Sequence, residues 1–349
     1  MPEFDFLLEL DLFRRSLGEQ QAVVRRFWEE GVRLLAGSGI RLNPIPKRWL
    51  GLRHNYFSVL FIAIFELLEI PFERRRFYAR LNHCYRTWVT ACDNLLDDEL
   101  KELFPTDLPQ EARIFKSVHS LLLADRIFFA LLQEAVAAGS FTPQEADRLL
   151  NISLTAISAS GREEAMEEAA ASNPGAGMDL TPDEILGEIH RPKTGQLFTA
   201  PLQAPLALGD IHGDHPRAKA FLEGLEQFGI GCQVLDDISD LGADLAAKKY
   251  NYLAAAIHHG ESATEKSALA ALIRAEPRED IAADSGLYRR FPKAAKATLR
   301  VAIDRLDAAL VRLADGGLPL GKTRRRLFMG ILTTLYGHPN ALLHIRPRT

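Results

Sequence analysis

Two aspartates spaced four residues apart, Asp236 and Asp240, give this sequence its clearest chemical signal. They lie in the segment 231–240, after an apolar stretch with a helical pattern, and the neighbouring Asp237 adds a third carboxylate. On a helix, residues four apart project from one face about one turn apart. Mg²⁺ prefers oxygen ligands and usually takes few carboxylates together with phosphate oxygens of a substrate. The spacing therefore predicts a magnesium site that binds a phosphorylated molecule.

The same spacing occurs upstream, in the segment 92–99. Asp93 and Asp97 are four residues apart, and Asp98 and Glu99 continue the acidic edge. One such pair is usually no more than a solvated helix face, because most aspartates are exposed. Two pairs in one helical chain favour a metal cluster held by both. We therefore expect the upstream carboxylates to share Mg²⁺ with the downstream pair.

Helices are the elements that must position these carboxylates. The segment 52–68 is apolar on almost every side, which predicts a central helix. A helix that begins at Pro71 reaches the first acidic segment, and a helix over 217–241 contains the second. Gly229 and Gly231 interrupt the latter helix, and we expect tight packing against a neighbour at these two positions.

Two capping boxes mark further helix starts, at 142–145 and at 181–184. The second box opens a helix that runs as far as residue 194. No segment of the sequence shows convincing alternation of apolar and polar residues, so strands are not expected. The predicted fold class is all-α, with roughly ten helices.

The length and composition of the chain describe one globular domain. Its 349 residues are 47% hydrophobic and 25% charged, which suffices for a sizeable core. No stretch of the sequence has the character of a linker between two independent cores. We therefore expect a single domain over residues 1–349, with the motif-bearing core at about 50–260.

Charge and hydropathy limit the partners of the chain. A formal net charge of −4 provides no basic surface for nucleic acid, so nucleic acid is not an expected partner. The longest apolar run, residues 56–65, is too short to span a bilayer, so stable membrane insertion is not expected either. The acidic N-terminus is unlike a signal peptide. These features favour a cytoplasmic protein.

Thiols and imidazoles are present without the spacing of a metal site. Cys84, Cys92 and Cys232 lie far from any zinc-like pair spacing, which indicates reduced thiols that serve packing. His83 and His190 also lack partner spacing, and we expect them to be surface or satisfied core residues.

With both acidic segments placed on helices, the sequence resembles the trans-polyprenyl diphosphate synthases, a family with the class I isoprenoid synthase fold. Residues 93–97 are similar to the family's first aspartate-rich motif. Residues 233–240 match its second motif, Gln-x-x-Asp-Asp-x-x-Asp, at every defining position. Three further landmarks follow the family's order: Pro105-Thr106, Leu122-Leu-Ala-Asp125 and Lys193-Thr194. The resemblance covers roughly Arg80 to Leu253.

This resemblance implies an all-α bundle with a central apolar cavity, commonly paired as a homodimer. It also implies an enzyme that ionises an allylic isoprenyl diphosphate at a Mg²⁺ cluster of up to three ions and couples the carbocation to a second prenyl unit. The implied metal ligands are Asp93, Asp97, Asp98, Asp236 and Asp240, and Asp237 joins the implied catalytic set. The residues implied to bind the diphosphate are Lys193, Thr194, Gln233, Lys248 and Arg53.

The sequence departs from the family at three places. Asn94 stands where the family has the second aspartate of its first motif, and Glu102-Leu103 occupy the region of its usual arginine pair. Leu52-Arg-His-Asn55 is a weakened version of the family's N-terminal basic segment. In the family those basic residues bind isopentenyl diphosphate. We therefore expect this chain to bind an allylic diphosphate far better than isopentenyl diphosphate.

Other functions are also compatible with the sequence. A terpene synthase that cyclises a single prenyl diphosphate needs only one diphosphate site. Gln233, Asp240, Asp244 and Tyr252 are spaced as in squalene and phytoene synthases, which couple two allylic diphosphates head to head. A catalytically silent subunit of a heteromeric synthase would keep the fold, but the retained acidic residues argue against it.

Trp88 and Val89 lie about one turn before Asp93 on the predicted helix. The resemblance implies that this level of the helix forms the floor of the hydrocarbon pocket, where Trp88 would limit chain length. The alternative is that Trp88 packs against a neighbouring helix, which is common for a large aromatic side chain. Periodicity alone does not choose between these two positions.

Overall fold

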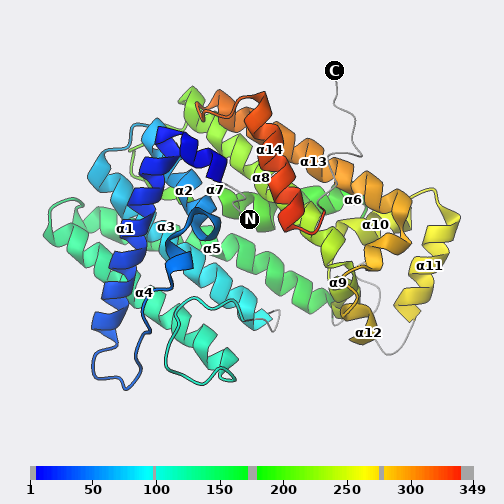
Figure 1. Ribbon diagram of the computed structural model, residues 1–349, viewed down its shortest axis with the longest axis horizontal. Helices are drawn as coiled ribbons and strands as arrows, with labels where there is room; N and C mark the ends of the chain where they lie inside the picture. The colour runs from blue at the N-terminus through cyan, green and yellow to red at the C-terminus, as the bar shows by residue number, and fades with distance from the viewer. Residues whose placement is uncertain (1–4, 97–99, 172–178, 275–278, 339–349) are drawn as a thin grey trace. The chain divides into compact units, whose positions relative to one another are not determined.

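The computed structural model describes residues 5–96, 100–171, 179–274 and 279–338. Every regular element in these ranges is helical, and their one strand-like contact is an isolated antiparallel bridge between Leu42 and Thr106 (Figure 1). None of the described helices combines the length and the hydrophobicity needed to cross a membrane. The prediction of an all-α fold is confirmed.

The helices follow one another along the chain. From the N-terminus to the middle of the chain they are η1 (Asp5–Glu9), α1 (Asp11–Leu34), η2 (Lys47–Leu50), α2 (Leu52–Leu67), α3 (Phe72–Leu96), α4 (Arg113–Ala137), α5 (Pro143–Ala171), α6 (Pro182–Glu184), η3 (Ile185–Gly195) and α7 (Gln196–Ala207). The remaining elements are α8 (Pro216–Ser239), α9 (Leu241–Ala247), α10 (Tyr252–His259), α11 (Ala263–Arg274), α12 (Glu279–Ala282), η4 (Leu287–Arg290), α13 (Pro292–Asp315) and α14 (Lys322–Leu335).

Two compact units make up the chain. The first consists of Met1–Ile157 with Pro201–His215, and the second of Ser158–Ala200 with Pro216–Thr349. Each unit is described by itself below. The expectation of a single domain over the whole chain stays a prediction.

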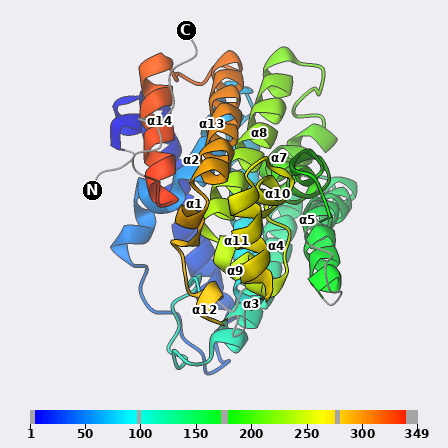
Figure 2. The same cartoon turned by 90° about the vertical axis from the view of Figure 1, so that its right-hand side faces the viewer.

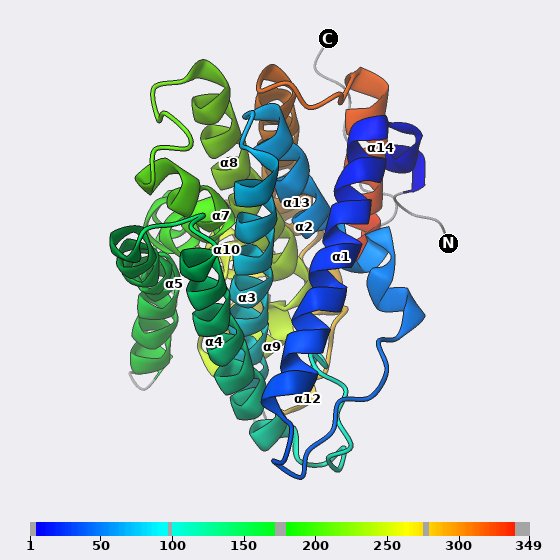
Figure 3. The same cartoon turned by 90° about the vertical axis from the view of Figure 1, so that its left-hand side faces the viewer.

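The centre of the first unit is α2, as its all-round apolar sequence predicts. Val59, Ala63, Ile64 and Phe65 have no exposed surface. A helix without a polar face must be covered by neighbours, and α1 and α3 pack against α2. Figure 3 shows α4 lying along α3, so that α3, which carries the first acidic segment, is held from two sides.

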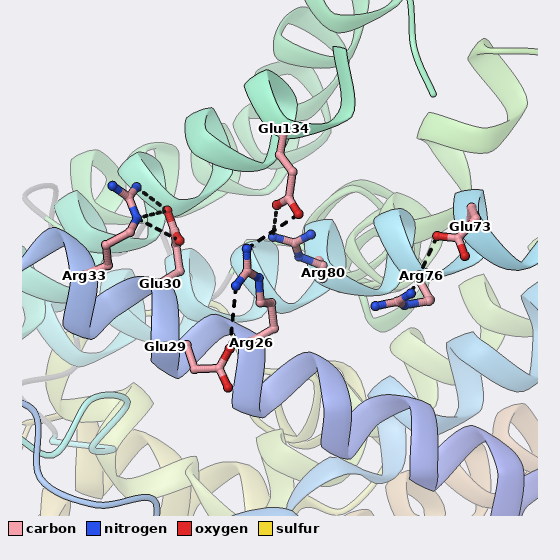
Figure 4. Close-up of polar contacts among 8 residues, drawn as sticks. All are labelled: Arg26, Glu29, Glu30, Arg33, Glu73, Arg76, Arg80 and Glu134. Atoms are coloured by element: carbon pink, nitrogen blue, oxygen red, sulfur yellow. Dashed lines mark hydrogen bonds and ion pairs between the residues drawn. The ribbon is translucent and has the colours of Figure 1, made fainter. Parts of the chain in front are cut away.

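Ion pairs connect charged side chains of α1, α3 and α4 (Figure 4). Glu134 of α4 accepts from Arg80 of α3 at 2.9 Å, and it lies 3.6 Å from a guanidinium nitrogen of Arg26 on α1. Because exposed pairs contribute only about 0–1 kcal/mol each, they orient these helices more than they stabilise them.

The segment after the first acidic motif is fastened to the loop that precedes α2. The amide of Asn43 donates to the carbonyl of Pro105 at 2.7 Å. Arg41 donates to the Asp107 carboxylate from its backbone amide at 2.9 Å and from Nε at 3.0 Å. Pro105-Thr106, which resembled a family landmark, therefore lies where the loop before α2 and the chain after α3 are joined by hydrogen bonds within the first unit.

In the second unit, α8 lies between α13 and the π-helix η3 (Figure 2 shows α13 beside α8). A Cβ atom added at Gly231 would lie 2.8 Å from Cγ of Leu306 on α13. One added at Gly229 would lie 2.5 Å from the Thr194 carbonyl oxygen of η3. The expected tight packing at these two glycines is confirmed, and it brings the backbone of residue 194 directly against α8.

The capping boxes form as the sequence predicts. The Glu145 amide donates to Oγ1 of Thr142 at 3.2 Å, and the Glu145 carboxylate accepts from the Thr142 amide at 2.8 Å. At the second box, the Thr181 amide donates to the Glu184 carboxylate at 2.7 Å. The helix that follows the second box is the π-helix η3, which the sequence did not predict, and it contains Pro192. Such wide helical turns are frequent at functional sites.

Candidate active site

The first acidic segment lies at the C-terminal end of α3, in the first unit. Asp93 is partly buried in the last turn of the helix, which ends at Leu96. The prediction that a long helix reaches this motif is confirmed. Asp97 and Asp98, the other two predicted ligands of this segment, lie outside the described residues.

Asn94, the residue that departs from the family's motif, is buried and closes the end of α3. Its Nδ2 donates to the carbonyl of Lys101 at 3.0 Å, and its Oδ1 accepts from the amide of Lys101 at 2.8 Å. A carboxylate could accept from the Lys101 amide but could not donate to the carbonyl. The asparagine therefore fixes the return of the chain after the acidic segment, a task that aspartate cannot perform.

The second acidic segment lies where α8 ends, in the second unit. Asp236 is partly buried in the last turn of α8, and Asp240 is the exposed residue that precedes α9. The Asp240 amide still donates to the Asp236 carbonyl at 2.8 Å, so the helical turn continues across this boundary. The prediction that the two carboxylates lie one turn apart is confirmed.

The donor set fits a hard divalent cation, since it consists of carboxylates alone. Within the described ranges, no group of three or more His, Cys, Asp or Glu side chains gathers closely enough to hold a metal ion. In the second segment the Asp236–Asp240 turn offers a pair, which is the usual protein share of a Mg²⁺ site completed by phosphate oxygens.

Asp237, predicted as a catalytic residue, is the buried centre of a hydrogen-bond network. Its side chain is only 2% exposed. Oδ2 accepts from the amide of Tyr252 at 2.6 Å and lies 3.1 Å from Nε2 of His190. Oδ1 accepts from Nε2 of Gln233 at 3.2 Å. Protein groups therefore engage both oxygens of Asp237.

Thr194 and Gln233, predicted to bind diphosphate, belong to the same network. Oγ1 of Thr194 donates to Oε1 of Gln233 at 2.7 Å, while the Gln233 amide nitrogen donates to Asp237. The hydroxyl, the amide and the carboxylate thus form one chain of hydrogen bonds from η3 to α8. The close approach at Gly229 makes this chain of contacts possible.

His190 is the member of this network whose function the sequence did not reveal. It is buried in η3, and its Nε2 donates to Asp237, which lies 47 residues further along the chain. Its Nδ1 is buried and has no hydrogen-bond partner among the residues that the structure describes. The sequence predicted a surface or a satisfied core histidine, whereas His190 is buried with one ring nitrogen unsatisfied within the described residues. No local spacing could have identified the partner.

Asp244 and Asn251 extend the network beyond the second motif. Nδ2 of Asn251 donates to Oδ2 of Asp244 and to the backbone carbonyl of Asp237, both at 2.7 Å. Burial, together with the nearby charge of Asp237, raises the pKa of Asp244 to about 8. Asn251 also caps α10 through its Oδ1. These residues therefore tie the start of α10 to the end of α8.

The three predicted cationic contacts lie in different surroundings. Lys193 of η3 is partly buried and forms an ion pair of 2.8 Å with Glu164. Lys248 follows α9 in the left-handed conformation, with φ of 57°, which glycine usually adopts at a helix end. Arg53 is exposed in the first turn of α2. Arg53 belongs to the first unit, and Lys193 and Lys248 belong to the second.

A cavity of about 290 Å³ in the first unit contains the basic residue that the sequence analysis missed. Arg86 lines it, as do His54 and Asn55 from the weakened basic segment, whereas Arg53 does not. Thr90, one turn before Asp93 on α3, lines the same cavity. Arg86, Thr90 and Asp93 follow the spacing of one helix face, and this spacing was the signal available in the sequence.

Trp88 lies on α3 near this level but contacts aromatic side chains. Its ring meets Phe128 of α4 edge-on, with 5.5 Å between the ring centroids, and lies 5.8 Å from Tyr85. Trp88 and Val89 are both partly buried. The packing alternative for Trp88 is supported by these contacts, and its role as a pocket floor stays a prediction.

Comparison with known proteins gives a likeness of fold. No family model and no curated protein matches the sequence. A decaprenyl diphosphate synthase from Rhodobacter capsulatus is 18% identical with a TM-score of 0.62, covering 97% of this chain and 99% of that one. A geranylgeranyl pyrophosphate synthetase from Pyrococcus horikoshii is 20% identical, with a TM-score of 0.58 and coverage of 93% and 98%. A polyprenyl synthase from Caulobacter crescentus, solved with calcium and isoprenyl diphosphate, is 18% identical, with a TM-score of 0.58 and coverage of 93% and 96%.

Proposed function

Because the chain has the fold of the trans-polyprenyl diphosphate synthases, we propose that it is a Mg²⁺-dependent prenyltransferase acting on an allylic isoprenyl diphosphate. The observation that carries this proposal is the helical turn between Asp236 and Asp240. It includes Asp237, whose buried carboxylate is held by hydrogen bonds. The Caulobacter crescentus protein was solved with a divalent cation and an isoprenyl diphosphate, which supports the same ligand class here.

In this proposal the carboxylates of both acidic segments hold the metal against the diphosphate. The ligands are Asp93, Asp97, Asp98, Asp236 and Asp240. When bound, Mg²⁺ supplies Lewis-acid stabilisation of the diphosphate charge that develops as the allylic carbon–oxygen bond breaks. Lys193 adds an ammonium charge toward the leaving group, with Lys248 and Arg53 as weaker candidates.

The residues around Asp237 act on the geometry of the site in this mechanism. Gln233, Tyr252 and His190 hold the Asp237 carboxylate, and Asp237 in turn fixes the last turn of α8. Asp236 and Asp240 are thereby aimed from a rigid helix end, which lowers the cost of organising the ligands when substrate binds. Thr194 is linked to this network through Gln233, and its contact with the diphosphate stays a prediction.

The experiment that tests the proposed function is incubation of the purified chain and Mg²⁺ with C10, C15 and C20 allylic diphosphates. Each is supplied with and without isopentenyl diphosphate, and products are identified by mass spectrometry. We expect metal-dependent release of diphosphate, abolished in Asp93→Ala and Asp236→Ala. The matched control Asp147→Asn changes an exposed aspartate on α5 and should keep full activity.

A binding measurement separates loss of the site from loss of the fold. Calorimetry with a non-hydrolysable allylic thiolodiphosphate should show Mg²⁺-dependent binding to the parent protein and to Asp147→Asn but not to Asp236→Ala. Full activity of both Asp93→Ala and Asp236→Ala would reject the site. Inactivity of the pure chain with every allylic diphosphate would instead favour a silent subunit.

The products of the same incubations distinguish the remaining alternatives. Cyclic hydrocarbons formed from one diphosphate would indicate a terpene synthase. A product with twice the carbon count of the allylic substrate would indicate head-to-head coupling, as in squalene and phytoene synthases. A lengthened diphosphate would indicate ordinary chain elongation.

We also propose that the protein is a homodimer, because α4 exposes an apolar stripe. Its members recur along one helix face with exposed fractions of 38–70%: Ile114, Phe115, Val118, Leu122 and Phe129. An exposed apolar patch of this kind marks an interaction surface. Light scattering should show a dimer that Leu122→Glu converts to a monomer, whereas Leu154→Glu, on α5 and 69% exposed, should remain dimeric. If the Leu122→Glu protein remained dimeric in light scattering, this interface would be contradicted.

A further inference from the structure

The cavity next to Arg86 is enclosed by elements of the first unit and has a volume of about 290 Å³. Its walls come from α1, from the start of α2, from α3 and from the chain around residues 101–103. Thr90 lines it one turn before Asp93, so the cavity reaches the part of α3 that lies just before the first acidic segment. A small molecule bound here would lie at the level of α3 just before that segment.

Arg86 is the charged group of this cavity. Its guanidinium donates to Oδ1 of Asn55 at 3.3 Å. No carboxylate of the described residues pairs with it, in contrast to Arg75 on the same helix, which binds Glu19 at 2.7 Å. Burial lowers the pKa of Arg86 to about 10, so the group remains a cation at neutral pH. A buried cation without an anionic partner is costly, and an anionic ligand would offset that cost.

The other titratable groups of the cavity add no net charge. Lys101 and Glu102 are exposed at its edge and are opposite in sign. Burial, with the nearby Arg86, lowers the pKa of His54 to about 4 and that of His83 to about 3, so both rings are neutral near pH 7. The cavity thus presents a single positive charge. A diphosphate carries more than one negative charge, and most of that charge would have no opposite charge in the cavity.

Aromatic rings form much of the remaining wall. Trp28 meets Trp49 edge-on at 5.6 Å, and the Trp49 ring stacks on His54 with a centroid distance of 5.2 Å. Phe27 lines the same cavity and packs against His83 at 4.5 Å. Such rings favour flat, apolar ligands that stack or meet them edge-on.

From these observations we propose that the cavity is the acceptor subsite and that it binds a flat aromatic monocarboxylate, with the carboxylate on Arg86, in place of a second diphosphate. This inference rests on the proposed prenyl transfer and names its acceptor class. In the transfer step the allylic carbon–oxygen bond breaks and its electron pair leaves with the diphosphate. A ring carbon of the acceptor supplies the pair for the new carbon–carbon bond, and the ring proton is released to water.

Binding of matched probes tests the subsite without any turnover. Calorimetry without Mg²⁺ or allylic diphosphate compares 4-hydroxybenzoate, its neutral amide 4-hydroxybenzamide, and isopentenyl diphosphate. We expect the acid to bind at least ~10-fold more tightly than the amide, the usual scale of about 1.4 kcal/mol for one charged contact. Isopentenyl diphosphate should bind more weakly than the acid. Tighter binding of isopentenyl diphosphate, or equal binding of acid and amide, would overturn the proposal.

Two arginine variants locate the charge. Arg86→Gln should remove the preference for the acid over the amide, while Arg76→Gln, at an exposed arginine of α3 outside the cavity wall, should keep it. Circular dichroism verifies the fold of both variants, and the acid–amide comparison in the parent protein stands even if Arg86→Gln does not fold. An Arg86→Gln protein that folds and retains the preference would overturn the assignment of Arg86.

Prenyl transfer then separates the two proposals. Incubation of a farnesyl donor and Mg²⁺ with 4-hydroxybenzoate should give a prenylated acid, detected by mass spectrometry. If the acid binds but only isopentenyl diphosphate is prenylated, the acceptor assignment is overturned while the proposed function stands. If no allylic diphosphate is consumed under any condition, the proposed function fails whatever the binding results.

Discussion

Asp237 in the second unit and Arg86 in the first are both charged groups withdrawn from water, and the protein treats them in opposite ways. The Asp237 carboxylate is held by Gln233, by the Tyr252 amide and by His190. The Arg86 guanidinium has one long hydrogen bond to an asparagine and no described carboxylate partner.

This difference separates a structural charge from a charge kept for a ligand. A carboxylate whose oxygens all accept from the protein is fixed and has little left to offer a substrate. A guanidinium with one weak partner keeps most of its donors for another molecule. Removing each charge in turn tests this difference.

Removing the Asp237 side chain should have the largest effect on stability. In Asp237→Ala the donors of His190, Gln233 and Tyr252 lose their acceptor in a buried place. We expect the free energy of unfolding to fall by about 3–5 kcal/mol, measured by urea titration without divalent cations. The control Asp147→Ala removes an exposed carboxylate of α5, and it should change stability by less than about 0.5 kcal/mol. Equal costs for the two variants would show that the network does not stabilise the fold.

Acid should destabilise the protein through the two histidines of the Arg86 cavity. Burial lowers the folded-state pKa of His54 to about 4 and of His83 to about 3, from an ordinary value of 6.5. The unfolded chain therefore takes up protons first, so their contribution to stability is complete above about pH 6.5 and is lost as the pH falls toward 3 to 4. Allowing for their partial exposure, we expect a loss on the order of 2 kcal/mol at pH 5.

The variant His83→Gln tests this origin of the acid sensitivity. Urea midpoints of the parent and the variant, measured from pH 7 to pH 5, should converge as the pH falls, because the variant lacks one of the two titrating rings. His258→Gln, at the exposed end of α10, controls for the replacement itself. Parallel pH curves for the parent and His83→Gln would contradict the assignment.

Replacing Asn94 by the aspartate of the family's motif should weaken the fold. Asn94→Asp loses the donor to the Lys101 carbonyl and places a carboxylate against that oxygen. We expect a cost of about 1–2 kcal/mol in thermal or urea unfolding. The matched change Asn151→Asp affects an exposed asparagine of α5 that bonds one turn back, and it should cost less than about 0.5 kcal/mol. A neutral Asn94→Asp would mean that the loop after α3 is held by other contacts.

Removing the Arg86 charge should have the smallest effect, in contrast to Asp237. Arg86→Met deletes a desolvated cation whose single hydrogen bond is 3.3 Å long, so we expect stability to be unchanged or raised by up to about 1 kcal/mol. Arg75→Met, on the same helix, leaves the partly buried Glu19 without its partner and should cost about 1–3 kcal/mol. If Arg86→Met costs as much as Arg75→Met, the guanidinium is structural and the comparison fails.

The sequence by itself determined the local features of this protein. The all-round apolar segment that becomes α2, the capping boxes at Thr142 and Thr181, and the one-turn separation of Asp236 and Asp240 were all predictable. Each depends on residues within one or two helical turns of one another, where spacing fixes geometry.

Tertiary structure alone decided which of the polar residues satisfy one another. Asp237 meets His190 across 47 residues of chain, Arg86 meets Asn55 across 31, and Asn94 meets Lys101 where the chain turns back. A helical pattern states which face a side chain occupies, but the partner opposite that face is set by how the helices pack. The sequence could therefore mark both Asp236 and Asp237 as acidic and could not show that Asp237 is enclosed by donors. For the same reason it placed the basic site at Arg53, whereas packing placed Arg86 in the cavity.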